Sequence, residues 1–307
     1  MPSLEAESAR TQTDLPFFTW NDADGPNSAF IKLLQACGAE SAKNIVLDET
    51  MRADFAGLVQ DALPEAKRQF TATTVGALRM SKDMDEYHKL KRNAISADTA
   101  MKAAWSKMKM GMSEVQVAEI ISDSFKSQDV APLFTIVGTG RNGAMPHHHT
   151  GTAILQKGDA VVMDIGGGKD GYSSDITRMA VIGSPPEGYA EIHAVVEAAV
   201  QAAMFAAKPG VKAHVVDDAA RRVITQAGYG EYFMHRTGHG MGVEIHETPY
   251  ISASSQTILK EGMVFSIEPG IYLPNRFGIR LEDIVILRAD GPEILSNLPR
   301  DVKIING

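Results

Sequence analysis

Two blocks of the chain repeat the same alternation of hydrophobic and polar positions. In the first block, apolar residues recur at helical spacing as far as residue 105, behind Asp83 and Glu86, which have the spacing of a capping box. A second capping box, from Ser113 to Gln116, opens a shorter helical segment, and the strand-like run APLFTIVGTG follows it. This order predicts two helices followed by strands.

The second block has the same order of elements. The long apolar segment EGYAEIHAVVEAAVQAAMFAAK is broken by Pro209-Gly210, the shorter helical segment AHVVDDAARRVITQAG comes next, and strand-like runs continue to the end. Gly111 and Gly210 precede the two short helices and lie 99 residues apart, as do His147 and His246. Helices followed by antiparallel strands, twice over, predict an α+β fold with two similar halves.

Residues 1–75 have a different pattern. A polar start and a turn at Asp24-Gly25-Pro26 lead to the helix-like SAFIKLLQAC, a short strand, NIVLD, and another helix that ends before Pro64. None of the candidate site residues named below lies in this stretch. We therefore predict one domain at 1–75 and a main domain at 76–307.

Composition and charge argue against several classes of protein. The 307 residues are 44% hydrophobic and carry a net charge of −8, which gives no support to nucleic acid or an anionic membrane as a partner. The N-terminus lacks the features of a signal peptide, and no apolar run approaches the ~20 residues that cross a bilayer. The single cysteine, Cys37, suits a reducing compartment. We expect a cytoplasmic protein.

Four carboxylates and one histidine in the strand-like runs form the candidate site. A carboxylate inside an apolar, β-branched run costs free energy unless its charge is compensated. Several such residues need a common partner, and a pair of divalent cations meets that need. The five residues are Asp164, Asp175, His239, Glu268 and Glu282.

The spacing of the acids predicts two hairpins. Gly166–Gly168 and Asp170-Gly171 are typical of a turn between the strands of Asp164 and Asp175. Both carboxylates can then lie side by side on one sheet face, where shared cations would remove their repulsion. The two glutamates flank a similar segment, and the histidine, between two glycines, adds a nitrogen ligand.

This ligand set is rich in oxygen and predicts a particular chemistry. Mn²⁺ fits it well, and Co²⁺, Fe²⁺ and Zn²⁺ are alternatives. Two ions roughly 3.5–4 Å apart, bridged by carboxylates, can hold a hydroxide and polarise a carbonyl or phosphoryl oxygen. The pattern therefore favours metal-assisted hydrolysis. The competing interpretation is that the acids are merely exposed charges at strand ends.

With these residues, the chain resembles the pita-bread metallopeptidases, and within them the branch of Xaa-Pro dipeptidases (prolidases) and aminopeptidase P. The resemblance implies a pita-bread fold with pseudo-twofold related halves. It also implies that Asp175 and Glu282 bridge two metal ions, that Asp164 completes one site, and that His239 and Glu268 complete the other. The matching runs are MDIGGGKDGYSSDITR, HRTGHGMGVEIHETP, IEPGIY and GIRLEDIVIL, with FTIVGTGRNGAMPHH upstream.

The resemblance assigns further roles around the metal ligands. It implies that His147 and His246 are active-site histidines that touch the substrate or the tetrahedral intermediate. Glu268 would carry a proton from metal-bound water to the leaving nitrogen, as a general acid and base. His235 and Arg280 are typical of the proline-specific branch, and we expect them to contact the substrate.

The implied function is a dinuclear metal-dependent exopeptidase that hydrolyses Xaa-Pro bonds in dipeptides or short peptides through a metal-bridging hydroxide. We expect a homodimer. Two alternatives stay open: another carbon–nitrogen hydrolase on the same fold, such as a methionine aminopeptidase, and a non-catalytic binding module. Members of the family usually carry a longer N-terminal domain, so we expect residues 1–75 to be a truncated remnant of it.

Overall fold

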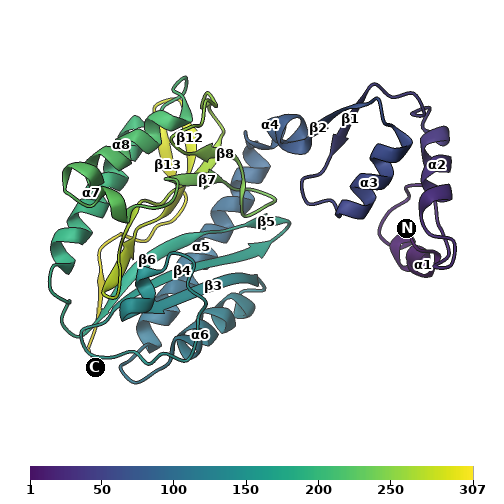
Figure 1. Ribbon diagram of the computed structural model, residues 1–307. Coiled ribbons are helices and arrows are strands. Elements are labelled where there is room, and N and C mark those ends of the chain that lie inside the picture. Colours follow the sequence, from purple (N-terminus) through teal and green to yellow (C-terminus); the bar gives the residue numbers. More distant parts are fainter. Residues whose placement is uncertain (307) are drawn as a thin grey trace. The chain divides into compact units, whose positions relative to one another are not determined.

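The computed structural model describes residues 1–306. They form two units, 1–76 and 77–306, each with contacts mainly inside itself (Figure 1). In the first unit, strands β1 and β2 pair in parallel, and α3 connects them. That this unit is the remnant of a longer domain stays a prediction. Its elements are η1 (Ser3–Glu5), α1 (Ala6–Arg10), α2 (Asn27–Ala36), β1 (Asn44–Leu47), α3 (Ala53–Ala62), β2 (Lys67–Phe70) and η2 (Thr71–Thr73).

The second unit begins with two helices and a sheet. After α4 (Val75–Arg79), helices α5 and α6 precede a mixed sheet with the strand order β14-β6-β4-β3, in which β14 from the end of the chain runs parallel to β6. The elements of this half are α5 (Met84–Lys107), α6 (Glu114–Ser127), β3 (Ala131–Thr139), η3 (Gly140–Ala144), β4 (Ala160–Lys169), β5 (Tyr172–Ser173), β6 (Ile176–Ile182) and β14 (Lys303–Ile305).

The second half repeats the layout of helices and then strands. Helices α7 and α8 precede an antiparallel sheet with the order β13-β12-β9-β7-β8, and β10 and β11 form a separate hairpin. The predicted α+β fold with two similar halves is therefore confirmed. The elements are α7 (Tyr189–Ala206), α8 (Ala213–Gln226), η4 (Gly230–Tyr232), β7 (Gly238–Gly240), β8 (Glu247–Ile251), β9 (Val264–Ile267), β10 (Gly270–Leu273), β11 (Phe277–Arg280), β12 (Asp283–Arg288) and β13 (Gly291–Ile294).

Side-chain capping fixes where the first two helices of the second unit begin. Asp83 caps α5 and Ser113 caps α6, and in both cases the residue three positions later returns the hydrogen bond, as the sequence predicts. Helix α7 begins differently, after Gly188 in a left-handed conformation, and buries the stripe Ile192, Val196 and Val200 against the core.

The strands of the first half divide their side chains between two cores. Along β4, Val161 and Met163 pack with the helices α5 and α6, whereas Ala160 and Val162 pack with residues of the second half. This is the alternation expected of a strand. Asp164, two residues after Val162, therefore lies on the same side of β4 and faces the second half.

The glycine-rich run after Asp164 is not the turn that the sequence suggested. Gly166–Gly168 belong to β4, and the turn is made by Asp170-Gly171, both with positive φ. The glycines are needed for packing: a Cβ on Gly166 would lie 2.1 Å from the Phe134 ring, and one on Gly167 would lie 2.6 Å from that of Phe125. Close approach of aromatic rings, rather than chain reversal, explains this run.

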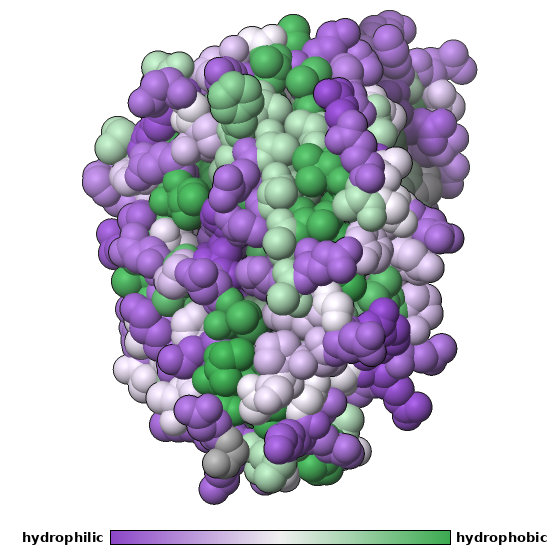
Figure 2. Space-filling view, turned by 90° about the vertical axis from the view of Figure 1, so that its left-hand side faces the viewer, coloured by the Kyte–Doolittle hydropathy of each residue, from purple (hydrophilic) through white to green (hydrophobic). Residues whose placement is uncertain are grey.

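The outer surface over α7 and α8 shows a band of apolar residues flanked by polar ones (Figure 2). Phe205 is the large apolar side chain of α7 that is most exposed. An exposed apolar side chain such as Phe205 is by itself ordinary on a protein surface. Within residues 1–306, the helices lack the combination of length and apolar character that crossing a bilayer requires.

We predict that Gly167→Ala destabilises the protein by about 1–3 kcal/mol, because the new methyl group would overpack the core against Phe125 and Val130. Denaturant titration measures the loss. The matched control is Gly168→Ala, whose methyl group meets only the end of the half-exposed Leu133 side chain. Equal losses in the two variants would contradict this account of the glycine run.

Candidate metal centre

The acids of the first half lie at the inner face of its sheet. Asp164 belongs to β4, and Asp175 immediately precedes β6. The antiparallel register of β4 and β6 places Asp164 opposite Thr177. The predicted hairpin therefore brings both carboxylates to the side that faces the second half.

The glutamates of the second half lie where its strands change partners. Glu268 stands between β9 and β10, and Glu282 between β11 and β12. Because β9 and β12 pair with Ile267 opposite Asp283, the two glutamates leave the sheet at the same level. His239 is the central residue of β7, which neighbours β9.

The glycines on either side of His239 allow this strand to fit. A Cβ on Gly238 would lie 1.9 Å from the carbonyl oxygen of Ser266, and one on Gly240 would lie 2.2 Å from that of Thr248. No side chain fits in that space. The two glycines therefore allow the neighbouring backbones to approach closely on both sides of His239.

The predicted site residues surround one cavity of about 630 Å³. In it, His239 Nε2 lies 3.3 Å from Glu268 Oε1 and 3.7 Å from Asp175 Oδ2. Asp175, His239 and Glu282 each offer an atom within 4.8 Å of the other two. All nine predicted residues line the cavity: His147, Asp164, Asp175, His235, His239, His246, Glu268, Arg280 and Glu282.

Further lining residues were not singled out from the sequence. Arg236 contributes a cation, and its guanidinium lies over the ring of Tyr250. Arg236 directly follows His235 in the run HRTGHGMGVEIHETP, and this position could have identified it as a site residue. The others, whose apolar character resembles that of core residues, are Phe134, Ile136, Pro146 and Ile245.

The donor set fits divalent cations. In the part of the chain that the structure describes, one buried oxygen on each of Asp164, Asp175 and Glu282 has no hydrogen-bond partner. A buried carboxylate oxygen left without a partner is costly, so these atoms need a positive ligand. Oxygen donors with one imidazole nitrogen suit hard or borderline divalent metals.

Burial and crowding shift the titration of these groups. Burial raises the pKa of Asp175 and of Glu282 well above the usual range, and the neighbouring carboxylates act in the same direction. Burial also raises the pKa of Glu268 to about 7, although Arg280 opposes the shift. Burial and the nearby His246 lower the pKa of His239 to about 3, so its imidazole is neutral and able to act as a ligand.

Hydroxyl groups hold the glutamates in place from behind. Thr177 Oγ1 donates to Glu282 Oε2 over 2.7 Å, and Ser266 Oγ donates to Glu268 Oε1 over 2.9 Å. Ser266 Oγ also accepts a hydrogen bond from the backbone N–H of His239. These contacts orient the carboxylates without neutralising them.

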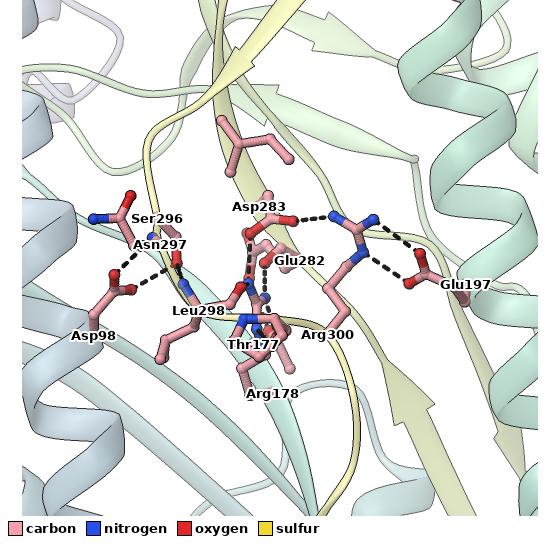
Figure 3. A network of polar contacts seen from close by, with 12 residues as sticks. Asp98, Thr177, Arg178, Glu197, Glu282, Asp283, Ser296, Asn297, Leu298 and Arg300 are labelled. Carbon is pink, nitrogen blue, oxygen red and sulfur yellow. Dashed lines mark hydrogen bonds and ion pairs between the residues drawn. The ribbon is translucent and has the colours of Figure 1, made fainter.

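A fully buried arginine joins the two halves behind Glu282 (Figure 3). Arg178 of β6 donates to the backbone oxygen of Glu282 and, over 2.6 Å, to the carboxylate of Asp283. Asp283 also pairs with Arg300 over 2.7 Å, and Arg300 forms a two-point ion pair with Glu197 of α7. A network of paired charges thus holds the backbone at the candidate ligand Glu282.

Arg280 pairs with the opposite half rather than with its neighbour Glu282. Its Nη2 lies 2.6 Å from Asp164 Oδ2, and its Nη1 donates to the hydroxyl of Tyr272 over 2.8 Å. That hydroxyl is also 2.8 Å from His235 Nε2. Arg280 therefore links one acid of the first half to the Tyr272 and His235 side chains of the second.

Two histidines approach the cavity from separate loops. His246 follows β7, and its ring meets the edge of the His239 ring with centroids 4.2 Å apart. His147 lies in the segment after η3 and lines the same cavity. Both side chains are exposed, as residues that meet a substrate must be. Their catalytic roles stay a prediction.

Two α+β halves around a buried cluster of carboxylates and imidazole define a pita-bread hydrolase that uses metal ions. The model of metallopeptidase family M24 matches residues 88–289, and the chain belongs to that family. It is a peptidase, and its chemistry depends on divalent metal. The resemblance drawn from the sequence motifs is confirmed.

Relatives match over almost the whole chain. A probable dipeptidase PepE of Mycobacterium tuberculosis is 38% identical across 99% of this chain and 82% of its own length. An Xaa-Pro dipeptidase of Pyrococcus furiosus is 35% identical across 98% of this chain and 85% of its own. The crystal structure of a prolidase from Thermococcus sibiricus superposes with a TM-score of 0.91 and 35% identity, covering 99% of this chain and 83% of that one.

We predict that Mn²⁺ raises the melting temperature of the chelated protein more at about pH 8 than at about pH 5.5. Burial raises the folded-state pKa of Asp175, Glu268 and Glu282, so the metal-free protein holds protons that the unfolded chain has lost. The stability that Glu268 contributes is present at low pH and is lost as pH rises through about 7, its folded-state pKa. The raised pKa values of Asp175 and Glu282 act in the same direction. Cations compensate the charges that then appear.

Differential scanning calorimetry with and without Mn²⁺ at the two pH values measures this difference. His239 is neutral at both, so its titration does not contribute. A stabilisation by Mn²⁺ that is the same at both pH values would show that the carboxylates are not its source.

Proposed function

We propose that this chain is a dinuclear metal-dependent exopeptidase that hydrolyses Xaa-Pro bonds in dipeptides or short peptides. The observation that carries the proposal is the convergence of acids and histidines from both halves on one cavity. Relatives named Xaa-Pro dipeptidase and prolidase support the specificity for proline. The volume of about 630 Å³ suits a short peptide rather than a folded chain.

We propose that the residues fitted to the metal are Asp164, Asp175, His239, Glu268 and Glu282, with Asp175 and Glu282 shared between two ions. Mn²⁺ is the metal that we propose, with Co²⁺, Fe²⁺ and Zn²⁺ as alternatives. When bound, such cations activate water and polarise the scissile carbonyl. The buried oxygens without hydrogen-bond partners on three of these residues support the assignment.

Glu268 has the properties of a proton carrier. It lines the cavity, and in the metal-free protein burial raises its pKa to about 7. A carboxyl group placed there can take a proton from water and pass it on, as a general acid and base. The nitrogen of proline in a peptide bond is a tertiary amide, which leaves only after it gains a proton. The Glu268 carboxyl group, which lines the cavity, can deliver that proton.

The two exposed histidines complete the polar wall of the cavity. His147 and His246 come from different halves and can donate hydrogen bonds to the carbonyl oxygen as negative charge develops on it. We propose that His235 and Arg280 contact the substrate on another side. The apolar residues Phe134 and Ile136 of β3 offer a surface for a proline ring.

We also propose a homodimer, on the resemblance to the family alone. Light scattering behind a size-exclusion column measures the mass, and a monomer at micromolar concentration would refute it.

The specificity is tested by chelating the protein, restoring Mn²⁺, Co²⁺ or Zn²⁺, and comparing three classes of peptide. We expect hydrolysis of Xaa-Pro or Xaa-Pro-Yaa and little of Met-Ala-Xaa, because the chain carries both His235 and Arg280. Preference for Met-Ala-Xaa would support the methionine aminopeptidase alternative. No hydrolysis with any metal would support a binding module.

Single substitutions separate metal ligands from other site residues. Asp175→Ala and Glu282→Ala should abolish activity and lower the bound metal measured by elemental analysis. His147→Ala and His246→Ala should keep the metal and lose about 10²–10³-fold in kcat, as expected when a donor to the oxyanion is removed. The control is His149→Ala, since His149 is an exposed histidine of the same loop that does not line the cavity. Full metal content in Asp175→Ala would overturn the ligand assignment.

A further inference from the structure

Glu114 is a carboxylate with no solvent exposure at the first position of α6. Its Oε1 accepts hydrogen bonds from the backbone N–H of Thr139 and from Asn142 Nδ2, both over 2.9 Å. Its Oε2 accepts from the backbone N–H of Gly151 over 3.0 Å and lies 2.8 Å from His148 Nε2. Burial alone would raise the pKa of Glu114, but these hydrogen bonds lower it below the usual value.

These four contacts reach the beginning, middle and end of one segment. Thr139 is the last residue of β3, and Gly151 lies two residues after the last of the three consecutive histidines. The segment between them carries His147, which lines the cavity. One buried side chain therefore holds the whole loop from which this histidine projects.

The loop that carries His246 is held in a comparable way. The next residue, Glu247, is buried, and its Oε1 lies 2.6 Å from Lys82 Nζ. Lys82 is also buried, with 1% of its side chain exposed. Glu247 Oε2 lies 2.7 Å from Arg79 Nη2, so both carboxylate oxygens are paired.

A glycine leaves room for this second pair. A Cβ on Gly242 would lie 2.8 Å from Glu247 Oε1 and 2.8 Å from Lys82 Cε. The backbone oxygen of Gly242 also accepts a hydrogen bond from Ser173 N–H. Contacts at Gly242 and at Glu247 thus fix the stretch between β7 and β8. His246 directly precedes Glu247.

The loops of His147 and His246 are held by the same arrangement of side chains. In each, the histidine points into the cavity, and the side chain immediately after it, His148 or Glu247, points inward to a buried ionisable partner. Surface loops are mobile unless they are tied to the core. A histidine that must meet a developing charge gains from having its position fixed before the substrate arrives.

We propose that Glu114 and Lys82 are positioning residues: each fixes the loop of one active-site histidine by pairing with the side chain that follows it. Glu114 acts on His147 through His148, and Lys82 acts on His246 through Glu247. This rests on the proposed function, in which both histidines act on the substrate. Neither positioning residue lines the cavity.

The first test measures the loops without any substrate. Glu114→Gln should speed hydrogen–deuterium exchange of amides in 140–151 and leave those in 241–247 unchanged, and Lys82→Met should do the reverse. The control is Arg92→Met, which breaks an exposed ion pair with Asp170 and should change neither loop. Exchange that stays at the wild-type level in the loop concerned, or that rises equally in both loops, overturns the proposal.

The second test is a pair of double-mutant cycles on the metal-loaded enzyme. Glu114→Gln should lower kcat about tenfold or more with little change in KM, since misplacement of a catalytic group can cost up to about 10²-fold. In the His147→Ala background it should have no further effect, because it acts only through that histidine. In the His246→Ala background its full effect should remain. Lys82→Met should show the mirror pattern.

Equal kcat losses in every background would show a general structural effect and overturn the proposal. If Glu114→Gln or Lys82→Met fails to fold, His148→Gln and Glu247→Gln remove the same pairs from the loop side. Failure of the proposed function is recognised separately: the wild-type enzyme would not hydrolyse Xaa-Pro peptides. The cycles would then be run on whichever peptide is cleaved, and without any cleavage the exchange experiment alone decides.

Discussion

Mutual repulsion among four carboxylates that line one cavity is the constraint on which the rest of this structure depends. Two acids come from the sheet of each half, and burial together with their neighbours raises the pKa of Asp175 and Glu282. Such a cluster is stable only when protons or cations compensate its charge. Arg280 does so for one oxygen of Asp164, and orphaned oxygens remain on three of the acids. The unpaired oxygens and the neighbouring imidazole therefore form a donor set that fits divalent metal.

Hydrogen bonds and ion pairs behind the acids hold the two halves together against this repulsion. Arg178 of the first half donates to the backbone of Glu282 in the second, and Thr177 beside it donates to the Glu282 carboxylate. Arg300, near the end of the chain, pairs with both Asp283 and α7. Removing one partner from a buried network of this kind leaves an uncompensated charge. The same contacts that orient a ligand therefore also hold the two sheets in register.

The order of helices and strands and the candidate metal ligands could be predicted from the sequence, because both depend on local patterns of residues. The capping boxes at Asp83 and Ser113 and the acids within apolar runs each have a local physical cause. The run Gly166–Gly168 was misread, since its reason is contact with aromatic rings distant in sequence. Glu114 and Lys82 escaped notice for a related reason: their partners lie 34 and 165 residues away. A pairwise contact of that separation leaves no pattern in a single chain.

In each half, a buried carboxylate of the second helix, α6 or α8, accepts hydrogen bonds from the backbone near the site. The two halves place this carboxylate at different positions. The 99-residue offset that relates the histidines maps Glu114 to Ala213, which has no carboxylate. One helical turn further on, the buried Asp217 of α8 accepts a hydrogen bond from the backbone N–H of Thr237, which immediately precedes the strand that carries His239. Because Asp217 serves that strand, the loop of His246 needs another anchor, and Lys82 supplies it. The two halves thus share the positions of their reactive groups more closely than the contacts that support them.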